Sequence, residues 1–316
     1  MRTSRLLLLT VPVVLALSAC TGPAPARTGD VAAVQPVGAS GTGTAPRAVT
    51  APGGSPTATP PATPGRPTDE RTADERTADG SDPADLPGAN RPGLPPPVVT
   101  NGARTGNKVA LTFDADMTDT MLANLASGRV RSYANIKIID MLQARQVPAT
   151  FFLTGEWAER YPDVTRRLAA DPRFELGNHS YRHQGFTPNC YQLGQVPPAQ
   201  MTEDVARTFR VIEPFGGRQT RYFRFPGGCY NGAALQALAP LGVTVIQWDV
   251  VSGDPFATAA APIVHAVLSQ VKPGSIVVLH VTEANAEYTD EALGPILDGL
   301  HARGLQPVTL SELLAP

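Results

Sequence analysis

Between residue 105 and the end of the chain, short apolar runs alternate with stretches of helical periodicity. The strand-like runs are residues 109–114, 149–153, 174–177, 222–224, 243–248, 275–280 and 306–308. The helical stretches are residues 135–145, 162–170, 201–212, 233–239, 259–270 and 290–303. Strands that alternate with helices predict a parallel sheet in an α/β domain, and about seven such units in roughly 210 residues predict a barrel.

Polar residues that can act in catalysis stand where several of these predicted strands end. They are Asp114, His179, Arg224, Asp254 and His280. Because the active sites of βα barrels form at the carboxyl ends of the strands, we expect these side chains to lie together. A purely structural domain has no reason to collect such residues at one edge, so the pattern indicates a chemical site.

His179 and His183 are two of the chain's five histidines and stand four residues apart. In a helical turn they would share one face, with both imidazoles directed at one point. Neutral imidazole is a common zinc ligand, but two histidines do not fill a coordination sphere. The pair therefore predicts a metal site whose remaining ligands lie elsewhere in the chain.

Residues 1–20 read as an export signal. A basic start precedes an apolar run over residues 6–17, which is too short to span a bilayer comfortably. Cys20 directly follows small residues where a signal peptide is cleaved, so the segment resembles a bacterial lipoprotein signal in which Cys20 becomes lipidated. The alternative is an ordinary secretory signal. Lipidation would anchor the exported protein to the outer face of the cell membrane.

Residues 21–104 are rich in Pro, Ala, Thr and Gly and hold almost no large apolar side chains. Such a composition cannot bury a core, so we expect a disordered linker between the anchor and a domain at residues 105–316. Compositional drift without a selected length is the other explanation of this region. The formal net charge of -2 gives no reason to expect nucleic acid, and we expect a monomer.

Five stretches of the domain together carry a family resemblance. They are residues 112–116 (TFDAD), 179–183 (HSYRH), 224–228 (RFPGG), 248–254 (WDVVSGD) and 278–280 (VLH). In this order they resemble the polysaccharide deacetylases with a NodB-type domain, carbohydrate esterase family 4. The resemblance implies a distorted barrel of about seven β/α units and a divalent metal, usually zinc. It also implies hydrolysis of an acetyl group, most often an N-acetyl group, on a sugar polymer.

The resemblance assigns roles around the metal. His179 and His183 match metal ligands, and Asp114 matches the catalytic base. The next family position is normally a metal-binding aspartate, but this chain has Ala115 there and Asp116 one residue later. Either Asp116 reaches back to the metal, or Asp114 or a water takes the third position.

Further residues match the rest of the family's catalytic machinery. Arg224 matches the arginine that orients the base and stabilises its charged form. The backbone N–H of Gly227 matches the group that joins the metal in holding the oxyanion, an approach that glycine permits. His280 matches the general acid. Asp254 matches the aspartate that raises its proton affinity, and Asp249 is the fallback partner.

The predicted acetyl pocket departs from the family pattern. Pro255 stands where the family usually has tryptophan, and Val278 stands where leucine is usual. Trp248 is expected to wall the pocket or to pack in the core. We therefore expect a pocket of different shape, which bears on the choice of substrate.

Cys190 and Cys229 each follow one of these motifs, and both segments should meet at the mouth of the barrel. With Cys20 lipidated, they are the cysteines left to pair in an oxidising compartment, so we expect a disulfide. The alternative is two separate buried thiols. Residues 117–134 form a longer connection than is typical at the same mouth. They would line a glycan groove, act as a lid or be a peripheral insertion.

Three functions are compatible with these residues. The first is a zinc-dependent hydrolase that removes N-acetyl groups from N-acetylglucosamine-type units of a cell-envelope polysaccharide such as peptidoglycan. The second is an O-acetyl esterase, for example on acetylated xylan, because the motifs read the acetyl group and not its linkage. The third is a non-catalytic cell-wall-binding protein on the same fold, for which Ala115 and Pro255 are the support.

Overall fold

The strand β2 (Lys108–Ala115) is the element around which the other strands are arranged. The computed structural model describes residues 82–316, which fall within one structural unit. The predicted export signal, Cys20 and the predicted linker up to residue 81 lie outside the described residues. In the described part of the chain, no helix is long and apolar enough to cross a membrane.

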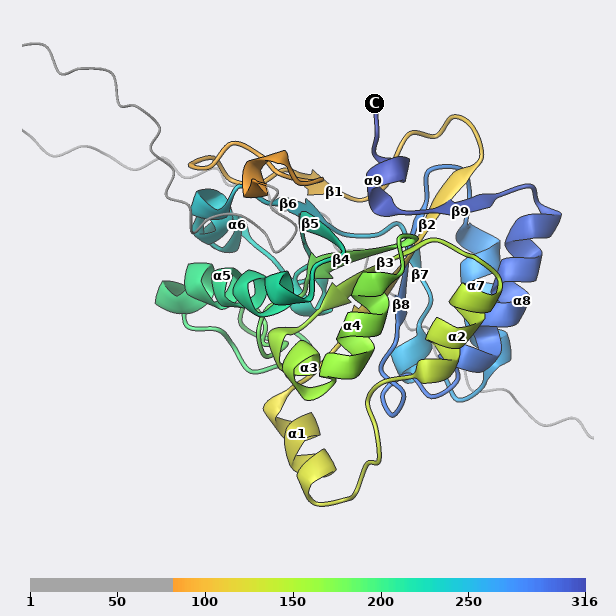
Figure 1. Cartoon of the computed structure of the whole chain (residues 1–316), viewed down its shortest axis with the longest axis horizontal. Helices are drawn as coiled ribbons and strands as arrows, with labels where there is room; N and C mark the ends of the chain where they lie inside the picture. The colour runs from red at the N-terminus through yellow and green to blue at the C-terminus, as the bar shows by residue number, and fades with distance from the viewer. Residues whose placement is uncertain (1–81) are drawn as a thin grey trace, which may run out of the picture. The chain divides into compact units, whose positions relative to one another are not determined.

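All strand pairings of the described sheet are parallel, in the order β1-β6-β5-β4-β3-β2-β8-β7, and β9 also pairs with β2. The other strands are β1 (Val98–Val99), β3 (Ala149–Leu153), β4 (Phe174–Asn178), β5 (Arg218–Phe223), β6 (Thr244–Ile246), β7 (Val250–Val251), β8 (Ile276–His280) and β9 (Gln306–Val308). The path ends at β1 and β7, so the sheet is a curled, open barrel (Figure 1). The predicted α/β fold with a distorted barrel is confirmed.

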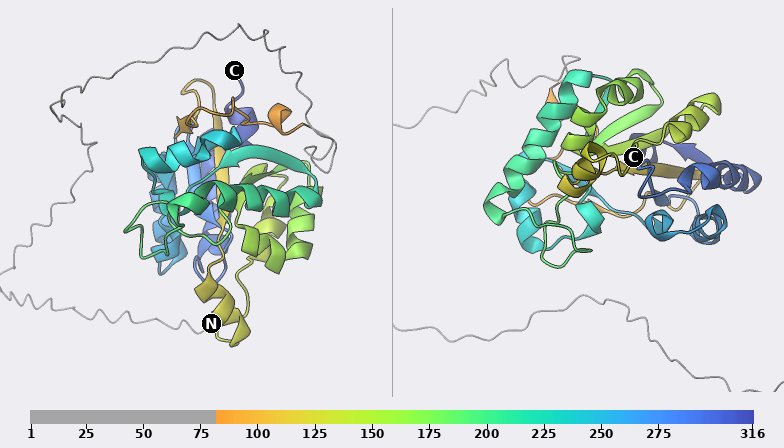
Figure 2. Two further views of the ribbon diagram at one scale, coloured as in Figure 1. Left: turned by 90° about the vertical axis from the view of Figure 1, so that its left-hand side faces the viewer. Right: turned by 90° about the horizontal axis from the view of Figure 1, so that it is seen from below.

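The described residues form nine α-helices, most of which cover the outer face of this sheet. They are α1 (Asp119–Ala126), α2 (Ile136–Ala144), α3 (Gly155–Arg160), α4 (Pro162–Ala170), α5 (Met201–Ile212), α6 (Gly232–Leu238), α7 (Ala260–Gln270), α8 (Thr289–Ala302) and α9 (Leu310–Leu313). Figure 1 shows α5 and α6 on the side of β5 and β6, and α2, α7 and α8 on the opposite side. Helix α1 projects beyond the end of the sheet at which β2 finishes (Figures 1 and 2).

Side chains alternate between two faces along β2. Leu111, Phe113 and Ala115 are fully buried against the helices, in one cluster with Ile139 of α2 and Leu293 of α8. Because successive side chains point to opposite faces of a strand, the residues between them face the concave side of the sheet. The concave side is therefore where polar residues of β2 must find partners.

Apolar residues of the concave side form one cluster that reaches from the sheet to α9, near the start of β2. This cluster consists of Ala110, Phe152, Tyr222, Ile246, Ile276, Val308, Leu310 and Leu313. Two of its members come from α9, which closes this end of the barrel. Asp114 and His280 lie at the carboxyl ends of β2 and β8, whereas the buried Thr150 and Glu175 accept hydrogen bonds from backbone N–H groups of α9 at the opposite end.

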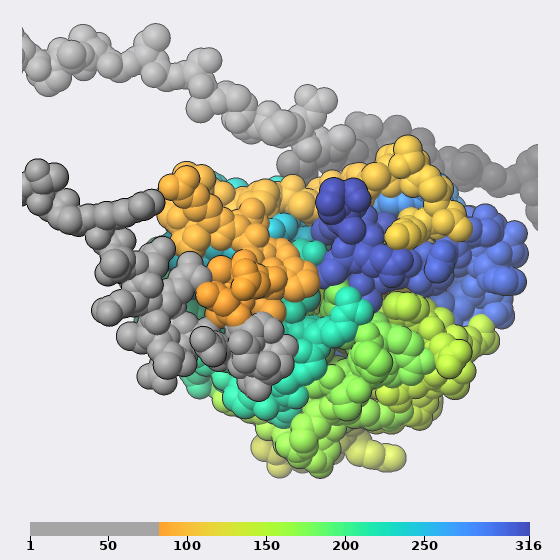
Figure 3. All heavy atoms as spheres, turned by 45° about the horizontal axis from the view of Figure 1, so that its top comes forward, coloured from red at the N-terminus to blue at the C-terminus, as the bar shows by residue number. Residues whose placement is uncertain are grey.

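The linker predicted to end at residue 104 ends earlier, because residues 82–104 lie on the folded unit. Strand β1 pairs with β6, and Asn90 donates a side-chain hydrogen bond to the carbonyl of Val243 at 3.3 Å. Figure 3 shows this segment, in orange and yellow, on the surface beside α9 in dark blue. Residues 82–104 could not be predicted to fold from their Pro- and Gly-rich composition, because they gain structure by pairing with a distant strand.

Three helices of the described residues were not predicted: α1, α3 and the four-residue α9. Helix α1 lies inside residues 117–134, where the Thr118 hydroxyl caps it by accepting a 3.2 Å hydrogen bond from the Met121 N–H. Helix α3 follows β3, and the Thr154 hydroxyl caps it by accepting from the Trp157 N–H at 3.3 Å. All three helices are short, so their apolar periodicity is too brief to be recognised.

Strand β5 begins at Arg218, earlier than the apolar residues predict. The Arg218 guanidinium pairs with the buried carboxylate of Glu175 at 2.8 Å. The Thr220 hydroxyl donates to the carbonyl of Leu176 at 2.8 Å. These partners on β4 allow polar residues to stand inside a buried strand.

Asp171 stabilises the turn between α4 and β4. Its carboxylate accepts hydrogen bonds from the Arg173 guanidinium at 2.8 and 2.6 Å and from the Gln143 amide at 3.0 Å. The bonds from Arg173 lower the pKa of Asp171 from 3.8 to about 2, although burial opposes the change. The charged carboxylate is therefore more stable in the folded protein than in the unfolded chain.

Replacing Asp171 by Asn should lower the free energy of unfolding by about 2 kcal/mol at pH 7. The difference from the parent should be complete above about pH 4 and should disappear as the pH falls toward about 2, because the folded-state pKa is the lower one. Urea unfolding at pH 7 and at pH 3 measures both values. A difference of equal size at the two pH values would contradict this account of Asp171.

Candidate active site

The carboxyl ends of β2, β4 and β8 bring the predicted polar residues together. Strand β2 carries Asp114 and is followed by Asp116, β4 leads into His179, and β8 ends in His280. Asp114 lies opposite His280 in the register of β2 against β8. Asp114 and His179 are 3% and 1% exposed, so the interactions of these groups are little screened by solvent.

Arg224 is fully buried and holds Asp114. Its Nη1 donates to Asp114 Oδ1 at 2.7 Å, and its Nε and Nη2 donate to the carbonyls of Ile246 and Gln247 at 3.4 and 3.5 Å. The guanidinium carbon also lies 4.1 Å from the ring centre of Phe152. These contacts fix the orientation of the Asp114 carboxylate.

Asp116 shares the concave side with Asp114, and Ala115 between them does not. Ala115 is fully buried in the core beneath the helices, whereas Asp116 Oδ1 lies 3.5 Å from His179 Nε2 and 3.4 Å from His183 Nε2. The backbone N–H of Asp116 donates to a threonine hydroxyl on the segment after β8 at 3.2 Å. Of the possibilities left open by the sequence, the structure places Asp116 beside the histidines.

His179 and His183 converge without the helical turn that their spacing suggested. They follow β4 in a turn in which Ser180 and His183 have φ values of 69° and 53°, and their ring centres lie 4.9 Å apart. The Nδ1–H of His179 donates to the carbonyl of Arg224 at 2.9 Å. This bond directs the other ring nitrogen of His179 toward the carboxylates, as is common for metal-bound histidine.

Asp116, His179 and His183 form a group that fits a divalent cation. One ligand atom from each lies within 4.8 Å of the other two, and the buried Asp116 Oδ1 has no hydrogen-bond partner among the described residues. Burial lowers the pKa of His183 to about 4, so the imidazole is neutral near pH 7. Burial alone would raise the pKa of Asp116, but the imidazoles of His183, His179 and His280 lower it. An ionised carboxylate with neutral imidazoles is the donor set that zinc prefers.

His280 faces this group from β8 and is held by Asp254. Its Nδ1 lies 2.9 Å from Asp254 Oδ1, and its backbone N–H donates to Asp254 Oδ2 at 2.7 Å. Burial alone would lower the pKa of His280, but the charge of Asp254 outweighs it and raises the pKa to about 10. The fallback partner Asp249 lies elsewhere, bound to Arg104 and to the backbone N–H of Ile276.

Asp254 has two further partners that the sequence analysis did not single out. The hydroxyls of Ser252 and Thr289 donate to its carboxylate at 2.6 and 2.8 Å. Burial would raise the pKa of Asp254, yet the charge of His280 and these bonds lower it. Ser252 lies in a motif already quoted, so it could have been found. Thr289 starts α8, and nothing in its local sequence signals the contact.

The predicted oxyanion and pocket residues lie beside these groups. Gly227 has a φ of 61° in the short turn after β5. A Cβ atom added at Gly228 would lie 2.6 Å from the Trp248 ring, so the indole packs against this turn. The Trp248 ring centre is 5.4 Å from the Arg224 guanidinium, and Val278 is buried on β8. The roles of Gly227, Trp248 and Val278 stay predictions.

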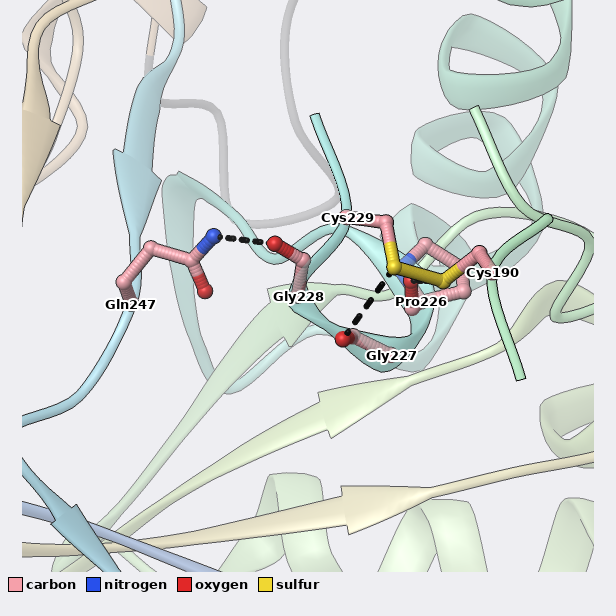
Figure 4. The surroundings of a disulfide bond; sticks show 6 residues. All are labelled: Cys190, Pro226, Gly227, Gly228, Cys229 and Gln247. Carbon is pink, nitrogen blue, oxygen red and sulfur yellow. Dashed lines mark hydrogen bonds between the residues drawn. A yellow bond between two sulfur atoms is a disulfide. The ribbon is translucent and has the colours of Figure 1, made fainter. Parts of the chain in front are cut away.

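The expected disulfide is present between Cys190 and Cys229, whose Cα atoms lie 6.0 Å apart. Figure 4 shows it beside the turn that carries Gly227 and Gly228. On the other side of this turn, the Gln247 side-chain amide donates to the Gly228 carbonyl at 2.9 Å (Figure 4). The disulfide therefore ties the segment after the histidines to the turn at the candidate active site.

Comparison with known proteins gives one family. The family model described as polysaccharide deacetylase matches residues 101–246. A chitooligosaccharide deacetylase of Sinorhizobium fredii is 30% identical over 178 residues, which cover 53% of this chain and 80% of the relative. A peptidoglycan-N-acetylglucosamine deacetylase of Bacillus cereus is 30% identical over 178 residues, or 56% of this chain. The chain spans 62% of the length of that second relative, which is less than two thirds.

Solved structures share the fold. That of the peptidoglycan N-acetylglucosamine deacetylase Bc1960 is 27% identical with a TM-score of 0.57, covering 69% of this chain and 92% of the other. That of a family 4 acetyl xylan esterase from Clostridium thermocellum, in complex with a cobalt ion, is 28% identical with a TM-score of 0.52. It covers 65% of this chain and 89% of the other. These likenesses agree with the open parallel barrel described above.

Replacing Asp116 by Ala should weaken zinc binding by more than about 100-fold, since even groups outside the ligand shell change metal affinity 10–100-fold. The double variant Ala115→Asp/Asp116→Ala should not recover it, because a side chain at position 115 points into the core beneath the helices. Isothermal titration with zinc measures both affinities.

The matched control is Asp249→Ala, which removes a nearby carboxylate that does not face the histidines. It should bind zinc as the parent does. Parent-like zinc affinity in Asp116→Ala would refute the assignment of Asp116 as a ligand, and circular dichroism checks that each variant is folded.

Proposed function

This chain belongs to the polysaccharide deacetylase family, and from that premise we propose that it removes N-acetyl groups from a cell-envelope polysaccharide. The proposed substrate unit is N-acetylglucosamine, and the proposed polymer is peptidoglycan. Two of the similar proteins are a chitooligosaccharide deacetylase and a peptidoglycan-N-acetylglucosamine deacetylase, which supports an amide substrate.

The observation that carries the proposal is an acid and a base candidate on either side of one candidate metal site. Asp114 Oδ2 lies 3.5 Å from His179 Nε2, and His280 Nε2 lies 3.8 Å from Asp116 Oδ2. The Asp114 carboxylate and the His280 imidazole thus both lie next to the same group of three ligand candidates. Metal-assisted amide hydrolysis needs this arrangement, because one group must take a proton and another must give one.

The chain's own residues divide the first half of the reaction between them. Asp116, His179 and His183 would hold a divalent cation, proposed to be zinc, which when bound acidifies a water and polarises a carbonyl. Asp114 accepts the proton of the attacking water as that water bonds to the acetyl carbon. Arg224 keeps the Asp114 carboxylate oriented for this transfer.

The second half of the reaction breaks the carbon–nitrogen bond. His280 donates its Nε2 proton to the leaving nitrogen, which gives acetate and a free amine on the sugar. Asp254 holds the His280 ring by Nδ1, so Nε2 faces the reacting group. The backbone N–H of Gly227 donates to the carbonyl oxygen as negative charge develops there.

Hydrolysis of O-acetyl esters, as on acetylated xylan, is the second candidate. The same base and acid act on an ester, and one similar structure is an acetyl xylan esterase. A non-catalytic cell-wall-binding role has less support. Ala115 does not remove the carboxylate from the site, because Asp116 takes its place beside the histidines.

We also propose that the protein is exported, anchored to the outer face of the membrane through lipidated Cys20, and monomeric. The support for anchoring is the sequence of residues 1–20 alone. Replacing Cys20 by Ser should release the protein from the membrane fraction into the medium, because the acyl chains are then absent. Immunoblotting of both fractions measures this, and a variant that stays in the membrane fraction would refute the anchor.

The zinc-loaded protein should release acetate from oligomers of N-acetylglucosamine, and a chelator should abolish the release. Asp114→Asn and His280→Gln should each lower kcat by about 10²–10⁴-fold, because each removes a proton-transfer group. Asp114→Asn should still bind zinc. Acetate assays and zinc titration measure these effects.

Chelator-sensitive release from acetylated xylan and not from the oligomers would favour the esterase. Release from neither would contradict both enzymatic candidates. Unchanged turnover in Asp114→Asn would refute its assignment as the base.

A further inference from the structure

Three exposed aromatic side chains mark the same end of the sheet as the candidate active site. Among the described residues, Tyr191, Tyr230 and Phe256 are 70%, 40% and 79% exposed. Tyr191 lies in the segment after β4, Tyr230 in the segment after β5, and Phe256 in the segment after β7. Each of these water-exposed rings stands on a segment that follows the end of a strand, where a binding partner can reach it.

Tyr191 is held in a backbone conformation that residues other than glycine rarely adopt. Its φ is 46°, and Asn189 and Gln192 on either side have φ values of 63° and 60°. Such residues raise the free energy of the native state, persist where the surroundings impose them, and cluster at functional sites. Here the surroundings include the disulfide, since Cys190 immediately precedes Tyr191 and is bonded to Cys229.

The ring of Tyr191 borders the turn that carries the proposed oxyanion donor. A Cβ atom at Gly227 would lie 2.9 Å from Tyr191 Cδ2 and 2.8 Å from Cys190 Sγ. A Cβ atom at Gly228 would instead meet the Trp248 ring at 2.6 Å. Tyr191 and Trp248 therefore pack on the same glycine turn, with Tyr191 the more exposed of the two.

We propose that Tyr191 is a sugar-binding platform that receives the pyranose ring next to the acetylated unit of a glycan chain. The phenyl face offers a flat apolar surface to the C–H face of a pyranose, and the phenol can hydrogen-bond a sugar hydroxyl. Its contact with the Gly227 turn places the platform beside the site of hydrolysis. The disulfide holds the platform there when no glycan is bound.

Tyr191 is better suited to this role than the second exposed tyrosine. Tyr230 already stacks on Phe225, with ring centres 5.5 Å apart and an angle of 14° between the planes. One face of Tyr230 is therefore used inside the protein. The choice of an amino-sugar polymer rests on the proposed function, whereas the platform requires only that a pyranose chain reaches this surface.

The tetramer of β-1,4-linked N-acetylglucosamine tests the platform in the zinc-loaded full chain. Tyr191→Ala should raise KM about tenfold and leave kcat unchanged, because one stacking contact is lost and no reacting group is touched. Tyr191→Phe should keep the parent KM within about threefold, since it retains the ring face. The matched control is Leu94→Ala, which removes an exposed apolar side chain, 61% exposed, from the segment before β1 and should change neither constant.

A binding measurement separates this proposal from the proposed function. Calorimetry with the glucosamine tetramer, which carries no acetyl group, should give a Kd about tenfold higher for Tyr191→Ala than for the parent. If the parent releases no acetate but shows this difference, the platform stands and the deacetylase assignment fails. Equal KM and equal Kd in the parent and Tyr191→Ala would overturn the platform. Failure of the parent to bind either tetramer would also overturn it.

The role of the Cys190–Cys229 disulfide in holding Tyr191 can be tested separately. The double variant Cys190→Ser/Cys229→Ser should show the same loss of tetramer affinity as Tyr191→Ala, because the platform is then free to leave the turn. Its zinc affinity should match that of the parent. Parent-like affinity for the tetramer in this variant would overturn the role of the disulfide.

Discussion

The alternation of side chains along β2 is the constraint on which both the fold and the site depend. Phe113 and Ala115 complete the core beneath the helices, while Asp114 and Asp116 reach the concave side of the sheet. Strand β2 and the residue that follows it thus supply the proposed base and a proposed metal ligand, two residues apart. A slip of one residue against β3 or β8 would exchange these faces, so the pairing register of β2 defines the site.

Asp114, Asp116 and Asp254 are buried carboxylates at this end of the sheet, and their partners differ. Asp114 is paired with Arg224, and Asp254 with His280 and two hydroxyls. Asp116 has imidazoles around it and an oxygen without a hydrogen-bond partner among the described residues. Because burying a charge is costly, a bound cation would stabilise this carboxylate further. A bound metal would thus contribute to the stability of the site as well as to its chemistry.

Local patterns in the sequence predict much of this arrangement. Strands β2, β3 and β8 are apolar runs, and the motifs at the ends of β2, β4 and β8 carry Asp114, His179 and His280, so both could be recognised from the sequence. The position of Asp116 could not be settled from the sequence. A motif match compares positions along the chain, whereas the alternation of side chains along β2 decides which residues face the concave side. The disulfide could be expected because the two cysteines flank neighbouring motifs.

Other features depend on contacts between distant segments, and no local pattern reports them. Thr289 reaches Asp254 only because α8 begins beside β8, and β1 is ordered by pairing with β6. Tyr191 has an ordinary sequence context, so its strained backbone and exposure are visible only in three dimensions. The sequence therefore predicts the chemistry of the site better than the surface around it.

A crystal structure of the zinc-loaded protein tests most directly whether Asp116 and the two histidines bind one metal ion. Anomalous data on both sides of the zinc absorption edge identify the ion. One ion should be bound by the Asp116 carboxylate and by Nε2 of His179 and His183, with Asp114 still hydrogen-bonded to Arg224. An ion that is ligated by Asp114 in place of Asp116, or the absence of an ion between the two histidines, would contradict this assignment.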